Sequence, residues 1–565
     1  MKSMVGDAGK DRAPYSLRHR FRIVLALFAS LVLYSAIRSP VPGVNEPHIL
    51  TKARHYWDPN FCRGDFYLES PDVYIVFYHT VGLLTRWMTL EQTAWTGRVI
   101  ALLVLAVGFD RLVSRIVPSR WSSLWVAWIY LSIAAIGRAF RFFLEDWSAR
   151  IFDLSGEWIV GGIEAKVFAY GFLFAAMGCW IDARRYRAAL LAGLAISFHP
   201  VVGVWGLIAA VFASLVERRH RRDDVAPPSR AVRQLRQWIV TAALLLVAAS
   251  PGLIPALKFA SGADPVLQQK AAYIQTFYRL QHHLDPMAIP WIAYGSYLGL
   301  AAVWLVGRRR ACLNPGERWF TWFVAGSVLV LLAGVLLGLR TGPPAEMPLW
   351  QIRARLLRFY PFRLADAMIP LAASMVIVGL ARQVAARKAD QTSRQIGLFR
   401  AIPGAALVCA LIACIFLPSL DRNPSRLSTQ QLADWKDVCG WIAAKTPVDA
   451  LFLTPTFNSG FKWYAHRPEF VCYKDCPQDA AGIVQWNNRL RFLSDWRSAH
   501  ADSRGRISAE AISKLRELSK TYEANGIQYI VSVDGWLGPF PLDAVYENRT
   551  CRVYSLEGIL KPLSR

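Results

Sequence analysis

Runs of about 20 predominantly apolar residues recur from residue 21 to residue 418, and a helix of that length crosses the hydrocarbon core of a bilayer. Apolar residues make up 54% of the 565 residues, which is more than an ordinary soluble enzyme carries. We therefore predict a mainly α, polytopic transmembrane helical bundle of about 10–11 spans. The apolar runs lie at 21–38, 93–116, 120–138, 159–181, 188–216, 237–257, 288–306, 318–338, 363–383 and 400–418.

The first apolar run is read as a retained signal-anchor. It follows Arg12, Arg18 and Arg20, and no small-residue cleavage site separates it from the polar sequence after residue 38. Residues 1–20 are then predicted to be a short cytoplasmic tail.

The positive charge is concentrated between the predicted spans. The formal net charge is +25, yet residues 421–565 hold 19 Lys and Arg against 16 Asp and Glu, so nearly all the excess lies before residue 421. This distribution follows the positive-inside rule and is not that of a nucleic-acid groove. We expect the lipid bilayer as a partner and no nucleic acid. The basic connectors, expected in the cytoplasm with the N-terminus, are 111–120, 182–187, 217–224, 307–310 and 382–388.

Two irregular segments decide whether all these connectors can share one side. Residues 72–90 are apolar and aromatic but carry His79 and Arg86, and we interpret them as an interfacial helix on the outer surface. Residues 188–216 are too long for one simple span and break at His199-Pro200, because proline disfavours helix in the residue before it. We predict two short half-spans there.

This topology gives three parts: the tail, a membrane domain over 21–420 and an extracytoplasmic α/β domain over 421–565. The membrane domain has outer loops at 39–92 and 139–158. In the last part, Ser428 or Thr429 is predicted to cap a helix, and helices near 479–494 and 507–524 separate strands of a partly parallel sheet. The predicted strands are 449–455, 468–473, 527–533 and 551–556.

The first outer loop carries the strongest functional signal. Residues 39–72 hold five acidic side chains, among them Glu46, together with His48 and His55. Carboxylates and imidazoles at a membrane surface can act as general bases or metal ligands. The alternative is a solvated loop in which the acids pair with neighbouring basic residues.

The second outer loop adds a further set of acids. Asp146 and Asp153, with Glu145 and Glu157, could converge with Glu46 on one nucleophile or one divalent cation, or could pair with nearby arginines. Glu164 and Lys166 follow at the rim of a span, where ionisable groups are costly. An i,i+2 spacing puts residues on different faces of a helix, so we do not expect those two to pair.

A cluster of arginines on the outer side breaks the positive-inside pattern. Arg353, Arg355 and Arg358 lie just before a span, with Arg363 at its start. Guanidinium groups bind phosphate oxygens in bidentate fashion, so we predict that the first three bind a donor phosphate. The alternative is a set of salt bridges with Glu346 and Asp366.

Five of the nine cysteines lie on the predicted outer side, where disulfides can persist. Cys472 and Cys476 lie near His466 and could ligate a metal, form a disulfide or remain free thiols.

Taken together, this order of parts resembles the membrane glycosyltransferases of the C superfamily (GT-C), which include protein O-mannosyltransferases, oligosaccharyltransferases and lipid A aminoarabinose transferases. The stretches WIAAKTPVDALFLTPTFNSGFKWYAHRPEFVCY (441–473) and RFYPFRLAD (358–366) are similar to segments of uncharacterised bacterial relatives. The resemblance covers most of the chain, as architecture and short motifs. It implies a protein of the bacterial cytoplasmic (inner) membrane.

The resemblance also implies an activity. Such enzymes transfer a sugar from a polyprenyl-phosphate-linked donor to an extracytoplasmic acceptor, and their catalytic acid lies in the first outer loop. The matching position here is Glu46 in GVNEPH, where the family more often has Asp. Asp146 and Asp153 would assist Glu46 or hold a divalent cation with it. The oligosaccharyltransferase Trp-Trp-Asp motif is absent from the last part of the chain, which argues against sequon glycosylation.

Two other classes of protein are compatible with this sequence. A transporter or flippase of a lipid-linked intermediate is expected to show repeat symmetry, and the sequence has no internal repeat. A non-catalytic membrane scaffold with the same fold is expected to tolerate loss of Glu46. The sugar and the acceptor are not determined by the sequence.

Overall fold

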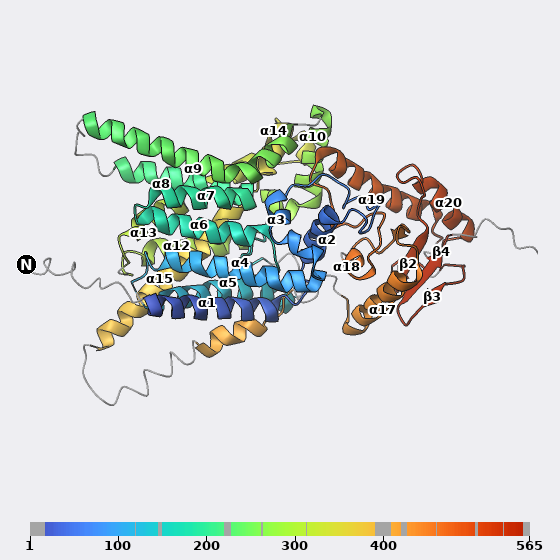
Figure 1. The fold of residues 1–565 in the computed structure, drawn as a ribbon, viewed down its shortest axis with the longest axis horizontal. Helices are drawn as coiled ribbons and strands as arrows, with labels where there is room; N and C mark the ends of the chain where they lie inside the picture. Colours follow the sequence, from blue (N-terminus) through green and yellow to red (C-terminus); the bar gives the residue numbers. More distant parts are fainter. Residues whose placement is uncertain are drawn as a thin grey trace, which may run out of the picture.

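The computed structural model shows an elongated molecule with a helical bundle at one end and a smaller mixed part at the other (Figure 1). It describes residues 17–118, 120–144, 150–219, 228–261, 264–311, 313–389, 408–419, 427–458, 460–502, 507–534, 536–538 and 540–556. The helices of the bundle run along the long axis of the molecule (Figure 1).

The long helices of the bundle coincide with the predicted apolar runs. They are α1 (Leu17–Arg38), α4 (Leu90–Val113), α5 (Ser122–Phe143), α6 (Ala165–Ile181), α7 (Arg185–Phe198), α8 (Pro200–Arg219), α9 (Pro228–Ser261), α12 (Trp291–Gly307), α13 (Gly316–Gly338) and α15 (Arg363–Ala389). Among the described residues, six helices are long and apolar enough to cross a membrane: α1, α5, α8, α13, and the Gln234–Lys258 and Arg363–Val384 stretches of α9 and α15. The shorter α6 and α12 are also apolar. The chain is an integral membrane protein. Of the last predicted run, 408–416 are helical and 400–407 lie outside the described residues.

Shorter elements connect these helices. They are α2 (Glu46–Trp57), α3 (Ile75–His79), η1 (Gly82–Arg86), α10 (Pro265–Tyr273), η2 (Ile274–Arg279), α11 (Gln281–Leu284), η3 (Pro286–Ala288), η4 (Pro344–Glu346) and α14 (Trp350–Leu357). Residues 72–90 thus form α3 and η1, of five residues each, which are too short to span a bilayer.

The break at His199-Pro200 is confirmed, but the prediction of two short half-spans is wrong for α8, which is long and apolar enough to cross a membrane. His199 has extended backbone angles and ends α7, and Pro200 is the first residue of α8. Proline is favoured at the start of a helix because its missing N–H would have no partner there. Pro47 likewise lies in the first turn of a helix, α2, which begins at Glu46.

The predicted basic connectors gather at one end of the bundle, which we call the basic end. Arg115 Nε lies 2.6 Å from Asp182 Oδ1, joining the 111–120 connector to the 182–187 connector. The backbone N–H of Asn314 donates to the carbonyl of Ile116 at 2.8 Å. The opposite end carries α2, α3 and the C-terminal part, and we call it the loop end (Figure 1). That the basic end faces the cytoplasm stays a prediction.

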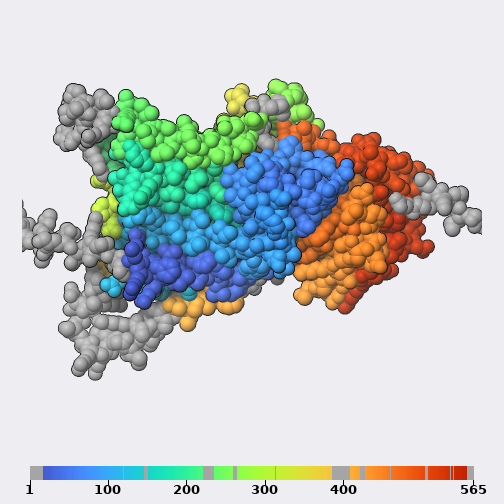
Figure 2. All heavy atoms as spheres, in the orientation of Figure 1, coloured from blue at the N-terminus to red at the C-terminus, as the bar shows by residue number. Residues whose placement is uncertain are grey.

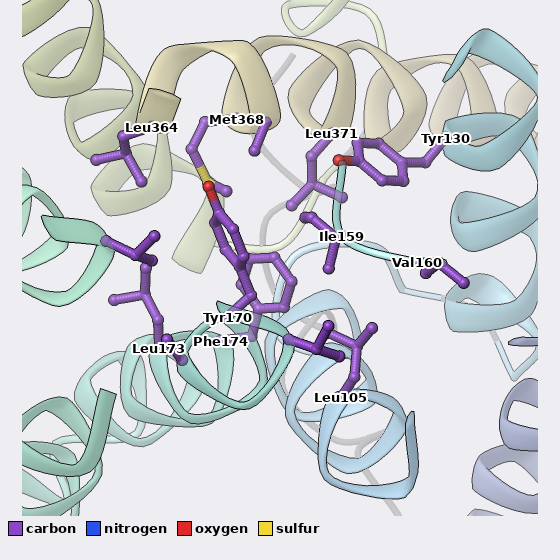
Figure 3. Packing of buried hydrophobic residues seen from close by; sticks show 14 of the residues in the cluster. Leu105, Tyr130, Ile159, Val160, Tyr170, Leu173, Phe174, Leu364, Met368 and Leu371 are labelled. Carbon is purple, nitrogen blue, oxygen red and sulfur yellow. The ribbon is translucent and has the colours of Figure 1, made fainter. Parts of the chain in front are cut away.

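The bundle packs tightly around α6. Tyr170 and Phe174 of α6 lie between α4 and α15 with Leu105, Met368 and Leu371 (Figure 3). A Cβ on Gly108 would lie 2.0 Å from the carbonyl oxygen of Gly171, so only glycine permits this contact of α4 with α6.

The C-terminal part combines four helices with a small sheet. Its elements are α17 (Thr429–Lys445), β1 (Phe452–Leu453), α18 (Phe461–Ala465), α19 (Ala480–His500), α20 (Ala509–Ser519), β2 (Tyr529–Val533), β3 (Tyr546–Glu547) and β4 (Cys551–Ser555). The strand order is β1-β2-β4-β3, with β1 and β2 parallel and the other pairs antiparallel. The partly parallel sheet is therefore confirmed.

One local detail of this part agrees with the prediction and two differ. Ser428 caps α17 in a capping box with Gln431. The segment 468–473 forms a single bridge, from Glu469 to Phe452, instead of a full strand. The strand β3 was not predicted, because two residues carry too little alternation to be recognised.

The C-terminal part lies directly against the first loop. Figure 2 shows the surface of residues near 40–90 in contact with that of the C-terminal part. The backbone N–H of Glu469 donates to Asp65 Oδ2 at 3.0 Å across this contact.

Candidate functional site

Glu46 lies at the loop end and is fully buried in an ion pair with Arg98 of α4. Arg98 Nε donates to Glu46 Oε1 at 2.6 Å, and Arg98 Nη2 donates to Oε2 at 2.7 Å. The backbone N–H groups of Gly43 and Ile163 donate to the same carboxylate at 2.6 and 2.8 Å. Four donors therefore surround the carboxylate.

These contacts do not support Glu46 as a general base. A base needs a free lone pair within reach of the acceptor hydroxyl, and this carboxylate is enclosed by Arg98 and two backbone groups. The contacts are those of a structural residue that joins the first loop to α4 and to the segment before α6.

Asp153 is likewise engaged in the fold. It forms an ion pair with Arg141, and its Oδ1 accepts the backbone N–H of Gly156 at 2.8 Å. Burial raises the pKa of Asp153, but Arg141 and two further arginines outweigh burial and leave the pKa below its usual value. Asp146 lies outside the described residues.

A divalent cation does not fit Glu46 and Asp153 as they stand. The oxygens of both carboxylates are already taken by guanidinium and backbone N–H donors, and a cation would have to displace those donors.

The three arginines predicted to bind phosphate do not converge. Arg353 donates to the carbonyls of Leu337 and Leu339 at 2.6 and 2.7 Å and so caps the end of α13. Arg358 donates to the carbonyl of Gln478 at 2.7 Å, which ties α14 to the C-terminal part. Arg355 is exposed.

A different set of ionisable residues meets at the loop end, which we call the Lys166 cluster. It comprises Glu157, Glu164, Lys166, His199 and Arg363. Lys166 Nζ lies 3.3 Å from Glu164 Oε2 and 3.9 Å from Glu157 Oε2. Arg363 Nε lies 2.9 Å from the same Glu157 oxygen. Two cations and two carboxylates thus share one buried region.

His199 completes the cluster in its neutral form. Arg363 Nη1 lies 3.2 Å from His199 Nε2, and because arginine can only donate, this nitrogen must accept. His199 thereby fixes the orientation of Arg363 without adding charge.

Asp366, at the start of α15, holds the second loop in place. Its carboxylate accepts the backbone N–H groups of Leu154, Ser155 and Glu157 at 3.1, 2.9 and 2.9 Å. These bonds aim the Glu157 side chain toward the first turn of α15.

Two buried polar atoms beside the cluster have no hydrogen-bond partner among the described residues: Glu157 Oε1 and Tyr170 Oη. Such atoms are rare in folded proteins, and they commonly mark places for water or a ligand. Tyr74, from the first loop, borders the same region, and burial raises its pKa to about 12.

The sequence alone pointed to part of the Lys166 cluster. It singled out Glu164, Lys166, His199 and Arg363, but the expectation that Glu164 and Lys166 do not pair is wrong. Glu164 precedes α6 with extended angles (φ −147°, ψ 155°), so helical spacing does not apply to the pair. Asn45 also donates to Glu164, which links the first loop to the cluster.

A second buried group of charges lies where the first loop meets the C-terminal part. Lys462 Nζ lies 2.5 Å from Glu469 Oε1, 2.5 Å from Asp475 Oδ2 and 3.4 Å from Asp65 Oδ2. We call these four residues the Lys462 cluster. Burial raises the pKa of Glu469 to about 7.

Potential metal ligands lie within this cluster. Ligand atoms of Glu469, Cys472 and Asp475 lie within 4.8 Å of one another. The Lys462 ammonium already occupies the point where the carboxylates converge, so no metal chemistry is assigned here. Cys472 and Cys476 are free thiols, and His466 is the left-handed residue that ends α18.

Comparisons with known proteins were made at three levels. A family model described as a domain of unknown function, DUF6798, matches residues 433–493. A search of curated proteins gave no match. Among solved structures, the chain is similar to ArnT of Cupriavidus metallidurans bound to undecaprenyl phosphate, at 11% identity and a TM-score of 0.45, over 97% of this chain and 100% of ArnT. It is also similar to the Archaeoglobus fulgidus oligosaccharyltransferase tethered to an acceptor peptide, at 14% identity and a TM-score of 0.32, over 90% of this chain and 69% of the other.

Proposed function

We propose that this protein is a membrane glycosyltransferase whose active site is the Lys166 cluster. The observation that carries the proposal is the pairing of two buried carboxylates with two buried cations at the loop end of a membrane bundle. Ionisable groups in such a position are costly and are retained chiefly for function. The donor class, a polyprenyl-phosphate-linked sugar, follows from the sequence resemblance to GT-C enzymes.

Glu164 is the residue we assign as general base. Its side chain is more exposed than that of Glu157, 11% against 2%, so an acceptor hydroxyl can reach it. The acceptor oxygen attacks the anomeric carbon of the sugar, the bond from that carbon to the phosphate oxygen breaks, and the hydroxyl proton moves to Glu164.

Lys166 and Arg363 are assigned to the departing phosphate. The bond that breaks leaves a negative charge on the polyprenyl phosphate, and cations held in place beside it lower the barrier. Each now contacts Glu157, and a bound phosphate would share these cations with that carboxylate. The unpartnered Tyr170 hydroxyl can donate to the same ligand.

The test separates lipid binding, measured on the purified full-length protein, from sugar transfer, measured in cells. Glu164→Gln should bind polyprenyl phosphate with unchanged affinity. Its sugar transfer should fall by about 10²-fold. Transfer is measured as restoration of a surface glycan in a deletion strain. Lys166→Gln should weaken polyprenyl-phosphate binding by about tenfold, the cost of one charged hydrogen bond. Glu69→Gln, an exposed acid of the first loop, is the matched control.

Full transfer by Glu164→Gln would remove this residue from catalysis. Unchanged polyprenyl-phosphate binding by Lys166→Gln would remove the phosphate assignment. Both results together would favour the scaffold or transporter alternatives.

A further inference from the structure

An apolar pocket lies in the half of the bundle toward the basic end, away from the Lys166 cluster. Its volume is about 520 Å³, and α6, α7, α8, α9 and α13 line it. Along α6 the lining runs from Leu173 to Trp180, whereas Lys166 lies in the first turn of that helix. At 1.5 Å per residue, Lys166 and Trp180 are separated by about 21 Å along the helix axis.

Small side chains explain why there is space between these helices. The lining includes Ala188, Ala189 and Ala192 of α7, facing Gly206 and Ala210 of α8. Small residues normally let helices pack closely. Here a volume within the usual range of ligand pockets remains between them.

The pocket opens sideways, in the direction of the surrounding lipid. Val211 and Leu215 of α8 line it and are 49% and 56% exposed. An apolar chain can therefore enter from the bilayer without crossing water.

The mouth of the pocket toward the basic end is polar and positively charged. A second cavity of about 280 Å³ shares Trp180, Ser214, Arg218 and Trp238 with the first and adds Arg185. Glu217 also lines it, and its carboxylate lies 3.5 Å from the guanidinium group of Arg318. The guanidinium groups of Arg218 and Arg185 lie 4.5 and 5.3 Å from the centre of the Trp238 ring. Two cations are thus fixed around one indole where the apolar pocket ends.

We propose that this pocket binds one acyl chain of an anionic glycerophospholipid, with the lipid phosphate at Arg185 and Arg218. The apolar lining fits the chain, and a guanidinium group at the mouth can bind the phosphate. The proposed lipid site rests on the pocket and its charges, and only the choice between phospholipid and polyprenyl phosphate rests on the proposed function.

The ligand assignment distinguishes two sources of lipid phosphate. The site lies at the end of the bundle opposite the one where we place the sugar donor, so we assign it to a bilayer phospholipid and not to polyprenyl phosphate. Basic pockets between helices at the cytoplasmic side of a membrane commonly bind anionic head groups.

The experiment measures lipid retention on the full-length protein by native mass spectrometry. Phosphatidylglycerol, phosphatidylcholine and polyprenyl phosphate are added separately to delipidated protein. Polyprenyl phosphate is also added in equimolar amount to the protein with bound phosphatidylglycerol. The parent should retain one phosphatidylglycerol in preference to phosphatidylcholine. Arg185→Gln and Arg218→Gln should each weaken retention of phosphatidylglycerol by about fivefold, the contribution of one basic residue near a lipid surface.

Two further variants make the result specific to the pocket. Ala242→Phe places a large ring in the pocket from an exposed position on α9 and should abolish retention. Arg219→Gln removes an equally exposed charge next to Arg218 that does not line the pocket, and it should retain the lipid.

Three results would overturn the proposal. These are equal retention of phosphatidylglycerol and phosphatidylcholine, unchanged retention in Ala242→Phe, and displacement of phosphatidylglycerol by equimolar polyprenyl phosphate. Full transfer by Glu164→Gln, which would contradict the proposed active site, would leave this lipid-binding result unaffected.

Discussion

Glu46 and Arg98 form a bidentate ion pair in which neither side chain is more than 2% exposed. The pair joins α2 of the first loop to α4 of the bundle, 52 residues further along the chain. A carboxylate that the sequence suggests as a base is thus engaged in holding the loop end together.

We predict that Glu46→Gln destabilises the protein. Removing one partner of a buried ion pair leaves the other charge uncompensated, at a cost of about 3–5 kcal/mol. The thermal unfolding midpoint in detergent should fall sharply. The double variant Glu46→Leu with Arg98→Met should recover part of the loss, because it leaves no buried charge. Unchanged stability with a hundredfold loss of transfer would instead restore Glu46 as the base.

Arg353 and Arg355 offer a matched pair of substitutions in one helix. Arg353→Ala should lower the unfolding midpoint, because the carbonyls that end α13 lose charged hydrogen bonds worth about 1.5–3 kcal/mol each. Arg355→Ala should leave the midpoint unchanged, since that side chain is exposed. Polyprenyl-phosphate binding should be the same in both variants, and a loss in either would support the phosphate site expected from the sequence.

The Lys462 cluster should make stability depend on pH. Burial raises the pKa of Glu469 from 4.5 to about 7, so between these values the folded state holds a proton that the unfolded state has lost. The contribution of Glu469 to the free energy of unfolding is fully present below pH 4.5 and is lost as pH rises through 7. Relative to Glu469→Gln, the parent should therefore lose stability between pH 5 and 8, by on the order of 3 kcal/mol at most.

The comparison with Glu469→Gln also removes an opposing contribution. Burial lowers the pKa of His48, which lies 2.9 Å from Asp475. The contribution of His48 to the free energy of unfolding is present above pH 6.5 and is lost as pH falls. Because Glu469→Gln keeps His48, this contribution cancels when the stability of the variant is subtracted from that of the parent. Glu510→Gln, at an exposed position on α20, should show no slope between pH 5 and 8. A stability difference between the parent and Glu469→Gln that does not change between pH 5 and 8 would contradict the prediction.

The orientation of the bundle can be tested by cysteine labelling. Ser508→Cys, in the C-terminal part, should react with a membrane-impermeant thiol reagent in intact cells. Arg219→Cys, at the basic end, should react only after permeabilisation. The parent protein, with its native cysteines, is the control. Labelling of position 219 in intact cells would reverse the predicted topology.

The sequence determined where the long apolar helices begin and end, because the length of an apolar run and the position of a proline are local properties. The break at His199-Pro200, the capping of α17 by Ser428 and the grouping of basic connectors all follow from neighbours along the chain. The pairing of charges was decided only by the tertiary structure. Glu46 meets Arg98, and Glu157 meets Arg363, because helices far apart in sequence end side by side. Composition cannot separate a carboxylate enclosed by donors from one that is left accessible. That difference arises from burial and from backbone N–H groups that only the folded chain brings near.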